Sequence, residues 1–285
     1  PDDLLHEGGR QEAILMVRWG MIIDLEKCAG CQACSFACVM ENNLPATPPE
    51  EAKRRRYDEW NEFLDVTIGA AKIPIPRPCM HCDDASCVKA CPTGSRFYFK
   101  EGRIVLQSYD RCIGCRICMT ACPYNVNYFM WFRPRGKLHM DNPDEVVIEG
   151  LGRVGPNRDI LGTPQKCTFC FHRLMKLKAD LERGMAGALS DLFPSGPKSW
   201  EEVGRAVDVL MRHLIEGRPL KLEGFEMRYL PACVSTCPTR SRIFGDLDDP
   251  NSLVSELSKS SRAFRLLEEL GNEPNVIYLS PLRRG

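Results

Sequence analysis

Residues 112–123 read CIGCRICMTACP, and the four cysteines of this stretch follow the spacing C-x2-C-x2-C-x3-C-P. Thiolates two residues apart allow one loop to wrap three corners of a 4Fe-4S cube, with backbone N–H groups turned toward its anionic sulfides. Gly114 lies inside that loop, where the missing side chain permits close approach of the backbone. The fourth cysteine follows after one helical turn and points toward a second cluster. The stretch therefore predicts a fold organised around paired iron-sulfur clusters.

The other cysteines repeat this arrangement, because all sixteen fall into four quartets with none left over. In chain order, the quartets are Cys28, Cys31, Cys34 and Cys38; Cys79, Cys82, Cys87 and Cys91; Cys112, Cys115, Cys118 and Cys122; and Cys167, Cys170, Cys233 and Cys237. Val39 replaces the proline after the first quartet, and two gaps are enlarged, one ending at Cys87 and one of 62 residues ending at Cys233. No thiolate is lost, because the enlarged gaps are loops that leave the sulfurs free to converge.

Three other uses of these cysteines fit the spacing less well. A disulfide framework has no reason to repeat C-x2-C at the head of each quartet, and such short bridges are of the labile redox kind. A Rieske centre needs C-x-H together with C-x-x-H, and only the first is imitated, at His81 and His172. Both histidines are therefore expected beside the ligands or at the surface. Zinc takes two ligands from each of two knuckles and has no use for a third cysteine, so a zinc-stabilised interaction module is the minor rival.

Composition and charge narrow the function further. The chain of 285 residues carries 38 basic and 38 acidic residues, so no net field draws it onto nucleic acid. No apolar run reaches the roughly eighteen residues of a membrane helix, and no transmembrane segment is expected. No export signal is visible at the beginning of the sequence, and the compartment stays open. The sequence also contains no phosphate-binding loop motif and no recognisable catalytic triad. Because it predicts redox centres but no substrate site, it indicates a protein that conducts electrons.

Hydrophobic patterning predicts short strands and helices around the quartets. We expect a strand ahead of Cys28, a hairpin over 95–107 with its turn at 100–102, helices within 171–228, a strand and short helix over 242–257, and a last strand over 276–280. The insertion 41–76 is Pro-rich and charged, and its basic run KRRR (53–56) reads as a solvated helix face, with a docking patch as the alternative. The aromatic segment after Cys122 is expected to serve in packing and subunit contact.

A cation stands directly before the first cysteine of three quartets, at Lys27, Arg111 and Lys166. Positive charge beside an anionic cluster stabilises the reduced state and raises the reduction potential. These three side chains are therefore candidates for tuning the clusters, although a solvent-facing strand end fits the same pattern.

On these residues the sequence resembles the four-cluster ferredoxin-like subunits of respiratory complexes, including the electron-transfer (beta) subunits of membrane-bound molybdopterin oxidoreductases of the DMSO and polysulfide reductase type. The matching stretches are RWGMIIDLEKCAGCQACSFACVMENNLP (18–45), PCMHCDDASCVKACPTGS (78–95), DRCIGCRICMTACPYNV (110–126), QKCTFCFHR (165–173) and PACVSTCPTRSRIFGDLDDP (231–250). The insertion 173–228 departs from the compact members, so no particular substrate is transferred.

The resemblance implies an α+β fold of two interleaved bacterial-ferredoxin-like modules, each holding two clusters. In this reading an outer module comprises 17–46 and 160–250 with the helical insertion 173–228, an inner module comprises 77–130, and extensions cover 1–16 and 251–285. The short hairpin between Cys91 and Cys112 agrees locally, since it is the connection found in a small two-cluster ferredoxin.

The resemblance also implies four 4Fe-4S clusters, with iron bound by all sixteen cysteines in four sets. Set 1 is Cys28, Cys31, Cys34 and Cys237; set 2 is Cys38, Cys167, Cys170 and Cys233; set 3 is Cys79, Cys82, Cys87 and Cys122; set 4 is Cys91, Cys112, Cys115 and Cys118. In the family's arrangement, set 1 faces a catalytic subunit and set 4 faces a membrane partner.

The implied role is a non-catalytic relay within an oxidoreductase complex of anaerobic respiration. It would pass electrons between a catalytic subunit, expected to carry a molybdenum or tungsten pterin, and a polytopic quinone-interacting membrane subunit. The expected location is peripheral on the membrane, with the extracytoplasmic face favoured. The alternative is the same relay in a molybdopterin-free membrane complex with cytochrome or heterodisulfide-reductase-like partners. The sequence leaves the substrate and the direction of electron flow open.

Overall fold

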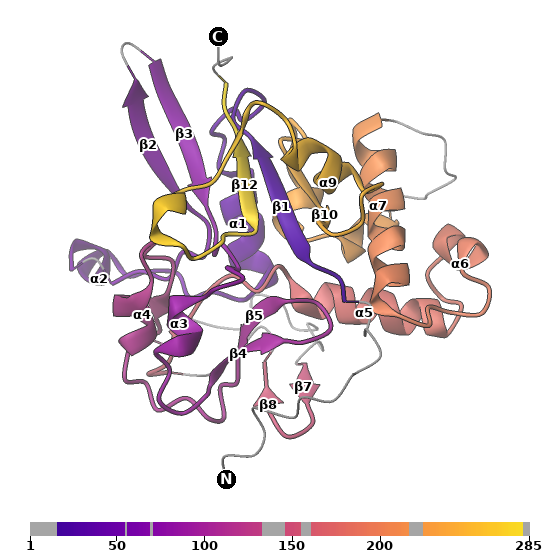
Figure 1. Cartoon of the computed structure of the whole chain (residues 1–285). Coiled ribbons are helices and arrows are strands. Elements are labelled where there is room, and N and C mark those ends of the chain that lie inside the picture. Colours follow the sequence, from indigo (N-terminus) through magenta and orange to yellow (C-terminus); the bar gives the residue numbers. More distant parts are fainter. Residues whose placement is uncertain are drawn as a thin grey trace.

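The computed structural model describes residues 16–54, 56–68, 71–132, 146–154, 161–216 and 225–281. Its central element is a four-stranded sheet with the order β10-β1-β12-β11. β1 (Trp19–Asp24) pairs antiparallel with β10 (Arg242–Asp246) and parallel with β12 (Val276–Leu279), while β11 (Ala263–Phe264) pairs antiparallel with β12. Figure 1 shows the consequence, which is that strands from the two ends of the chain lie side by side.

β1 is buried along its whole length, as expected for a continuous apolar run covered on both faces. The ring of Trp19 stacks on Phe244 of β10 with 5.1 Å between the ring centroids. The strand leads directly into Cys28, whose N–H donates to the carbonyl of Asp24 at 3.1 Å. The predicted strand ahead of the first quartet is therefore confirmed, and it fixes where that quartet begins.

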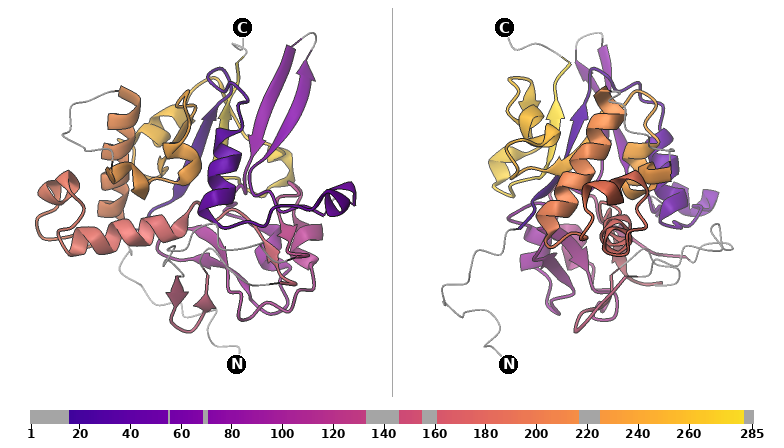
Figure 2. Two further views of the ribbon diagram at one scale, coloured as in Figure 1. Left: turned by 180° about the vertical axis from the view of Figure 1, so that it is seen from behind. Right: turned by 90° about the vertical axis from the view of Figure 1, so that its right-hand side faces the viewer.

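The described part of the insertion within the fourth quartet contains α5 (Phe171–Glu182), α6 (Ala188–Leu192) and α7 (Trp200–Glu216), so the predicted helices within 171–228 are present. α7 packs on β10 and on α9 (Leu253–Ser258). Its inward face repeats at helical spacing, since Val203, Val207 and Leu210 are fully buried. Figure 2 shows α7 standing beside the sheet while α5 runs across its lower end.

One short helix carries cysteines in each quartet. These helices are α1 (Ala33–Glu41), α3 (Ser86–Lys89), α4 (Ile117–Ala121) and α8 (Ala232–Ser235). α1 packs against α8, and α3 packs against α4. The helices of the first and fourth quartets are thus neighbours, and so are those of the second and third.

The predicted hairpin between the second and third quartets is confirmed. β4 (Arg96–Phe99) and β5 (Ile104–Gln107) pair antiparallel, with Phe99 opposite Ile104 across the turn. The turn also accepts a contact from the central sheet, because Gly102 lies against the Trp19 ring, where a side chain would clash. The hairpin therefore joins the second and third quartets and packs against the sheet that leads into the first quartet.

The insertion 41–76 also contains a hairpin that was not predicted. In its described residues α2 (Pro49–Lys53) is followed by β2 (Glu62–Ile68) and β3 (Ala71–Arg77), which pair and project from the sheet end of the molecule (Figure 1). In the stretch EFLDVTI the apolar Leu64, Val66 and Ile68 alternate with polar residues, and the stretch is rich in β-branched residues, which favours a strand over a helix. The charge run masked this alternation.

Short elements complete the described chain. They are β6 (Tyr128–Phe129) paired with β9 (Pro164–Gln165), β7 (Val147–Ile148) paired with β8 (Gly152–Arg153), η1 (Phe225–Tyr229) and η2 (Glu268–Leu270). The expected strand, helix and last strand after the fourth quartet are present as β10, α9 and β12. The α+β class is confirmed. The expected N-terminal extension lies almost wholly outside the described residues, and the module boundaries stay predictions.

Candidate iron-sulfur cluster sites

The four cysteines of set 2 line one cavity inside the molecule. Cys38 comes from α1, Cys167 and Cys170 from the turn before α5, and Cys233 from α8. Each is between 6% and 8% exposed, and Met21, Phe169 and Pro231 close the wall around them. Burial raises the pKa of the Cys38 thiol well above its usual range, and the other three cysteines of the set raise it further. Sulfurs from three separate segments therefore converge on one enclosed space.

The cysteines of set 4 line a second cavity, which opens to solvent. Cys118 is buried, Cys91 and Cys112 are half-buried, and Cys115 is exposed. Ile113 beside them is 69% exposed. Sets 2 and 4 thus share one donor composition and differ in their access to water.

In sets 1 and 3, the electrostatic effect of one cysteine on the pKa of another shows that the sulfurs lie near one another. Burial raises the pKa of the Cys28 thiol, and Cys34 and Cys237 add to the rise. In set 3, burial raises the pKa of the Cys82 thiol, and Cys79, Cys87 and Cys122 all contribute. Each predicted set therefore contains sulfurs that lie within electrostatic reach of one another. Cys31 of set 1 is exposed, whereas Cys79, Cys82 and Cys87 of set 3 are buried.

The four C-x2-C turns share one backbone conformation. The residue before the second cysteine has positive φ in every quartet, at Gly30 (65°), His81 (45°), Gly114 (69°) and Phe169 (55°). In each turn its N–H points at the sulfur of the first cysteine, at 3.5 Å for His81 and Cys79 and at 3.4 Å for Phe169 and Cys167. The corresponding N–H groups of Gly30 and Gly114 lower the pKa of Cys28 and Cys112 against the larger effect of burial.

This conformation presents N–H donors to anionic sulfur, which is what a thiolate ligand of a cluster requires. Where the residue is not glycine, the positive φ costs conformational free energy, because a residue with a bulky side chain seldom adopts it. At two turns it is offset by packing, since the rings of His81 and Phe169 stack with 3.8 Å between centroids. The two non-glycine turns thus support each other across sets 3 and 2.

The two histidines of the imitated Rieske elements are both buried. His81 is held neutral, because burial lowers its pKa well below the usual range and the cations Lys166 and Arg96 lower it further. His172 Nε2 lies 2.6 Å from Glu41 Oε1, and Arg173 Nε donates to the same oxygen at 2.6 Å. The His172 ring therefore has charged partners beside set 2, whereas the His81 ring is held by its stacking on Phe169.

All sixteen cysteines lie in the described residues, and none forms a disulfide bond. No group of three or more His, Cys, Asp or Glu side chains in the described part of the chain is arranged to hold a single metal ion. A zinc ion draws thiolates to ~2.3 Å from one point, whereas an iron-sulfur cluster spreads its ligands around a larger body. Cysteines that line a cavity together suit the larger group.

Comparison with known proteins agrees with this chemistry. Two models described as 4Fe-4S dicluster domains match residues 71–135 and 111–241. The chain is 38% identical to the menaquinone reductase iron-sulfur cluster-binding subunit of Nitratidesulfovibrio vulgaris, over 93% of this chain and 89% of that protein. It is 36% identical to a selenate reductase subunit of Mesobacillus selenatarsenatis, over 93% of this chain and 72% of the relative. It is 34% identical to the arsenate respiratory reductase iron-sulfur subunit ArrB of a Shewanella species, over 92% of this chain and 96% of that protein.

The chain belongs to the 4Fe-4S dicluster family of respiratory iron-sulfur subunits. The resemblance drawn from the cysteine stretches is confirmed, and so is the role in electron transfer within a respiratory complex. Members of this family hold several 4Fe-4S clusters, which accords with the sixteen cysteines. Within the described residues, no helix combines the length and apolarity needed to cross a membrane.

The cations nearest the sulfurs are mostly not those expected. Lys27 and Arg111 are exposed, and Arg111 donates to the carbonyl of Gly150. Lys166 is buried, and its Nζ donates to the carbonyl of Cys167 at 2.9 Å and to the carbonyl of Val105. Two buried arginines, Arg96 and Arg242, also lie beside cysteine sulfurs. Sequence reasoning missed both, although each stands five residues after the last cysteine of a quartet.

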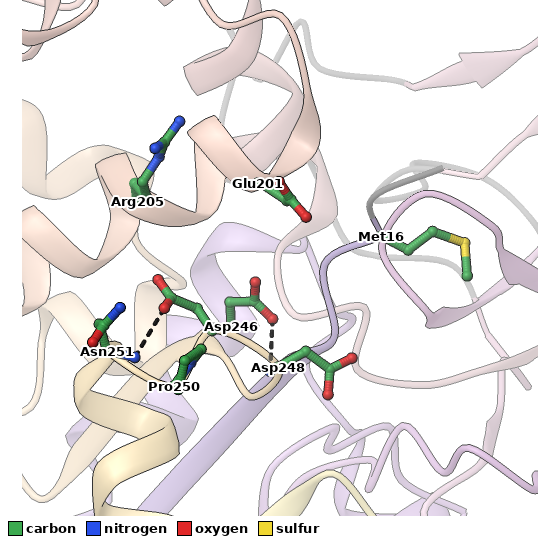
Figure 3. A pocket seen from close by; sticks show the side chains of 8 residues that line it. Met16, Glu201, Arg205, Asp246, Asp248, Pro250 and Asn251 are labelled. Carbon is green, nitrogen blue, oxygen red and sulfur yellow. Dashed lines mark hydrogen bonds between the residues drawn. The ribbon is translucent and has the colours of Figure 1, made fainter. Parts of the chain in front are cut away.

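A separate hollow of about 320 Å³ lies away from the cysteines and is lined by Met16, Glu201, Arg205 and the loop after β10 (Figure 3). Its carboxylates hold that loop in place. Asp246 accepts from the N–H groups of Arg18 and Asp248, and Arg18 Nε donates to Asp248 at 2.8 Å. Burial raises the pKa of Asp246 to about 6. These acidic groups have structural partners and form no catalytic arrangement.

Proposed function

We propose that sets 1 to 4 each bind one 4Fe-4S cluster and that the chain relays electrons between a molybdopterin-containing catalytic subunit and a quinone-interacting membrane subunit. The observation that carries the ligand assignment is the cavity lined by Cys38, Cys167, Cys170 and Cys233. These cysteines come from the first and fourth quartets, so the quartets interleave in space. When bound, the clusters supply one-electron transfer.

The residues around the sulfurs suit a cluster in three ways. Thiolates are the donors that iron-sulfur clusters use. Backbone N–H groups at the positive-φ turns stabilise anionic sulfur, and Asn61 Nδ2 donates to Cys34 at 3.2 Å. Apolar walls such as Met21 and Phe169 exclude water from the inner cavity. The same burial raises the pKa of the free thiols, so cluster binding must release protons.

Electrostatic interactions between cysteines of neighbouring sets, and a cation shared by the last two sets, support a linear order from set 1 to set 4. Cys34 of set 1 lies within the field of Cys233 of set 2, and Cys79 of set 3 lies within the field of Cys167 of set 2. Arg96 faces Cys87 of set 3 and Cys118 of set 4. The chain thus brings each set close to the next one in the series.

The two outer sets reach the surface. Cys31 of set 1 is exposed, and Phe36 on α1 is 70% exposed. At the opposite end of the series, Cys115 of set 4 is exposed beside Ile113 and Ile117, which are also exposed. Apolar side chains around an accessible redox site suit contact with another subunit. Set 1 would face the catalytic subunit and set 4 the membrane subunit.

The names of the relatives support both proposed partners, the catalytic subunit and the quinone-linked subunit. One belongs to a menaquinone reductase, and two others belong to selenate and arsenate reductases. We infer that this chain likewise serves a catalytic subunit at one end and a quinone-linked subunit at the other. It would lie peripherally on the membrane, at the extracytoplasmic face.

Chemical analysis of the anaerobically purified chain tests the ligand proposal. We expect about sixteen iron and about sixteen acid-labile sulfide per chain, from four cubes of four. Markedly fewer than about twelve irons would mean that at least one set is not a cluster site, and zinc at a comparable level would favour the interaction-module alternative. In the intact complex, copurified pterin supports the molybdopterin partner, and a complex with haem but without pterin contradicts it.

A further inference from the structure

The loops that follow the last cysteines of the second and fourth quartets repeat one another. Residues 91–96 read CPTGSR and residues 237–242 read CPTRSR. In both loops the cysteine sulfur accepts a backbone N–H, from Arg96 at 3.4 Å and from Ser241 at 3.3 Å. Each loop ends in an arginine that begins a strand, Arg96 in β4 and Arg242 in β10. Two distant parts of the chain therefore place an arginine at one and the same position relative to a cysteine ligand.

Both guanidinium groups are buried, and neither pairs with a carboxylate of the described residues. Arg96 is 2% exposed and Arg242 is 1% exposed. Neither forms an ion pair with Asp or Glu within the described residues, and Nε and Nη1 of Arg96 have no hydrogen-bond partner there. An uncompensated buried charge is costly, so each arginine needs negative charge from another source.

Cysteine sulfurs are the anionic groups that these arginines face. Arg96 Nη2 lies 3.8 Å from Cys118 Sγ, and Arg96 lines the set 4 cavity. Arg242 Nη2 donates to Asn61 Oδ1 at 2.7 Å, and Asn61 Nδ2 in turn donates to Cys34 Sγ at 3.2 Å. A second nitrogen of Arg242 points at Met21 Sδ, a wall of the set 2 cavity, at 3.5 Å.

Each arginine is shared by two sets. The electrostatic interactions of Arg96 are with Cys118 of set 4, with Cys87 and Cys79 of set 3, and with Tyr109. Those of Arg242 are with Cys233 of set 2, with Cys34 and Cys237 of set 1, and with Tyr278. Lys166 differs, because its ammonium donates to two backbone carbonyls. The two arginines thus occupy equivalent positions, Arg242 beside sets 1 and 2 and Arg96 beside sets 3 and 4.

We propose that Arg242 and Arg96 are positioning residues that set the reduction potentials of sets 1 and 2 and of sets 3 and 4, respectively, each as a single buried charge common to two clusters. A guanidinium whose charge acts on two clusters favours the reduced state of both, so it raises the two potentials together. This inference rests on the proposed binding of a cluster by each set.

The test compares Arg242→Gln and Arg242→Lys in the full chain, loaded with clusters under anaerobic conditions. Arg240→Gln is the matched control, because Arg240 lies in the same loop, carries the same charge and is exposed. Iron and sulfide are measured first, and potentiometric titration followed by electron paramagnetic resonance then gives the midpoint of each reducible component. The equivalent pair for the other loop is Arg96→Gln and Arg96→Lys.

We expect Arg242→Gln to keep its iron and to lower two midpoints, with a change of about tenfold in the ratio of reduced to oxidised cluster at fixed potential, or ~59 mV for a one-electron couple. Arg242→Lys should restore both midpoints, and Arg240→Gln should leave all of them unchanged because exposed charge is screened. Arg96→Gln should move the other two components.

Unchanged midpoints in a fully loaded Arg242→Gln protein, or a shift of one component alone, would overturn the proposal. If Arg242→Gln loses iron, Arg242→Lys decides, since it keeps the charge. A Lys protein with normal iron and normal midpoints supports the proposal, whereas a Lys protein that loses iron, or that has lowered midpoints, assigns the residue to packing and overturns it. A wild-type chain without iron would instead contradict the proposed function.

Discussion

The cavities of sets 2 and 4 hold equal numbers of cysteine sulfurs in opposite surroundings. Every cysteine of set 2 is buried, and the cavity wall is built from the central sheet, α1 and α8. Set 4 opens to solvent at Cys115, and its rim carries the exposed side chain of Ile113. The C-x2-C turns are nevertheless alike in conformation. Local loop geometry thus provides the donors, and the packing around the loop decides whether a site is interior or accessible.

This difference divides the duties of a relay. An interior site is protected from water but leaves buried charge and empty volume behind when its ligands are removed. An accessible site can exchange electrons with a partner and contributes less to the fold. The predictions below separate these two duties by making matched changes in the two surroundings.

The largest difference is expected between Cys38→Ala and Cys115→Ala. Both should lose one cluster, so that iron falls from about sixteen to about twelve per chain. Cys38→Ala leaves three buried thiols and an empty core cavity, and the Tm should fall on the order of 10 °C, whereas Cys115→Ala should lower the Tm by about 2 °C or less. Anaerobic thermal unfolding followed by circular dichroism measures both. Equal losses of Tm would show that exposure does not separate the two sites.

The second effect concerns Glu41, which joins α1 to α5 beside set 2. Its carboxylate accepts from Arg173 Nε and lies 2.6 Å from His172 Nε2. Although burial opposes it, these partners lower the Glu41 pKa from 4.5 to about 2. Because the pKa is lower in the folded state, the stabilisation is complete above pH ~4.5 and is lost as pH falls toward 2.

Glu41→Gln should therefore lower the Tm by about 4–8 °C, corresponding to roughly 2 kcal/mol for a partly buried pair. The difference from wild type should be full above pH ~4.5 and should shrink as the pH falls toward 2, and thermal unfolding at several pH values across that range checks this. Arg173→Lys keeps the charge but loses the forked geometry, and an intermediate Tm is expected. A difference that does not shrink as the pH falls would assign the stabilisation to another group.

Much of the cluster chemistry could be predicted from the sequence, because ligand type and spacing are local properties. The quartets, the strand before Cys28 and the hairpin over 96–107 follow from residues close together in the chain. The paired helices α1 with α8 and α3 with α4 accord with the expected interleaving. The assignment of individual cysteines to four sets stays a prediction until iron binding is measured.

Proximity in sequence predicted the buried Lys166 but not the buried arginines Arg96 and Arg242. Lys27 and Arg111 precede cysteines directly, yet both side chains are exposed. Arg96 and Arg242 stand five residues from a cysteine and become buried because β4 and β10 carry them into the interior. Burial is decided by tertiary packing, which the spacing of cysteines does not report. The repeated CPT-x-SR loop was the available signal, and its meaning required the fold.

The hairpin β2–β3 shows a second limit. Its strands lie in a segment dominated by charged residues and prolines, so the alternation in EFLDVTI was overridden by composition. The positive φ of His81 and Phe169 could not be predicted either, because among the residues of a sequence it is glycine that indicates such a conformation. Both conformations are fixed by contacts between distant segments, here the stacking of the two rings.

A third, smaller effect is expected at the surfaces beside the two outer sets. Phe36→Asp and Ile113→Asp place a charge on exposed apolar side chains that have no role in the core. Burying that charge at a subunit contact should weaken assembly by about tenfold or more, roughly 1.4 kcal/mol, while iron content stays normal. Phe36→Asp should weaken binding of the catalytic subunit, and Ile113→Asp binding of the membrane subunit. Pull-down of each partner measures this, and Val147→Asp, which also lies at an exposed apolar residue, tests whether the effect is specific to position.

The smallest effect is expected at an ion pair that repeats the chemistry of Glu41 and Arg173 in open solvent. Lys53 Nζ lies 3.1 Å from Glu50 Oε1 on α2, and the side chains are 73% and 75% exposed. Water screens both charges and competes for their hydrogen bonds, and fixing two long side chains costs entropy, so such pairs contribute about 0–0.5 kcal/mol. Lys53→Gln should change the Tm by no more than about 2 °C. A drop as large as that of Glu41→Gln would mean that α2 is held by more than local contacts, and that burial is not what distinguishes the two pairs.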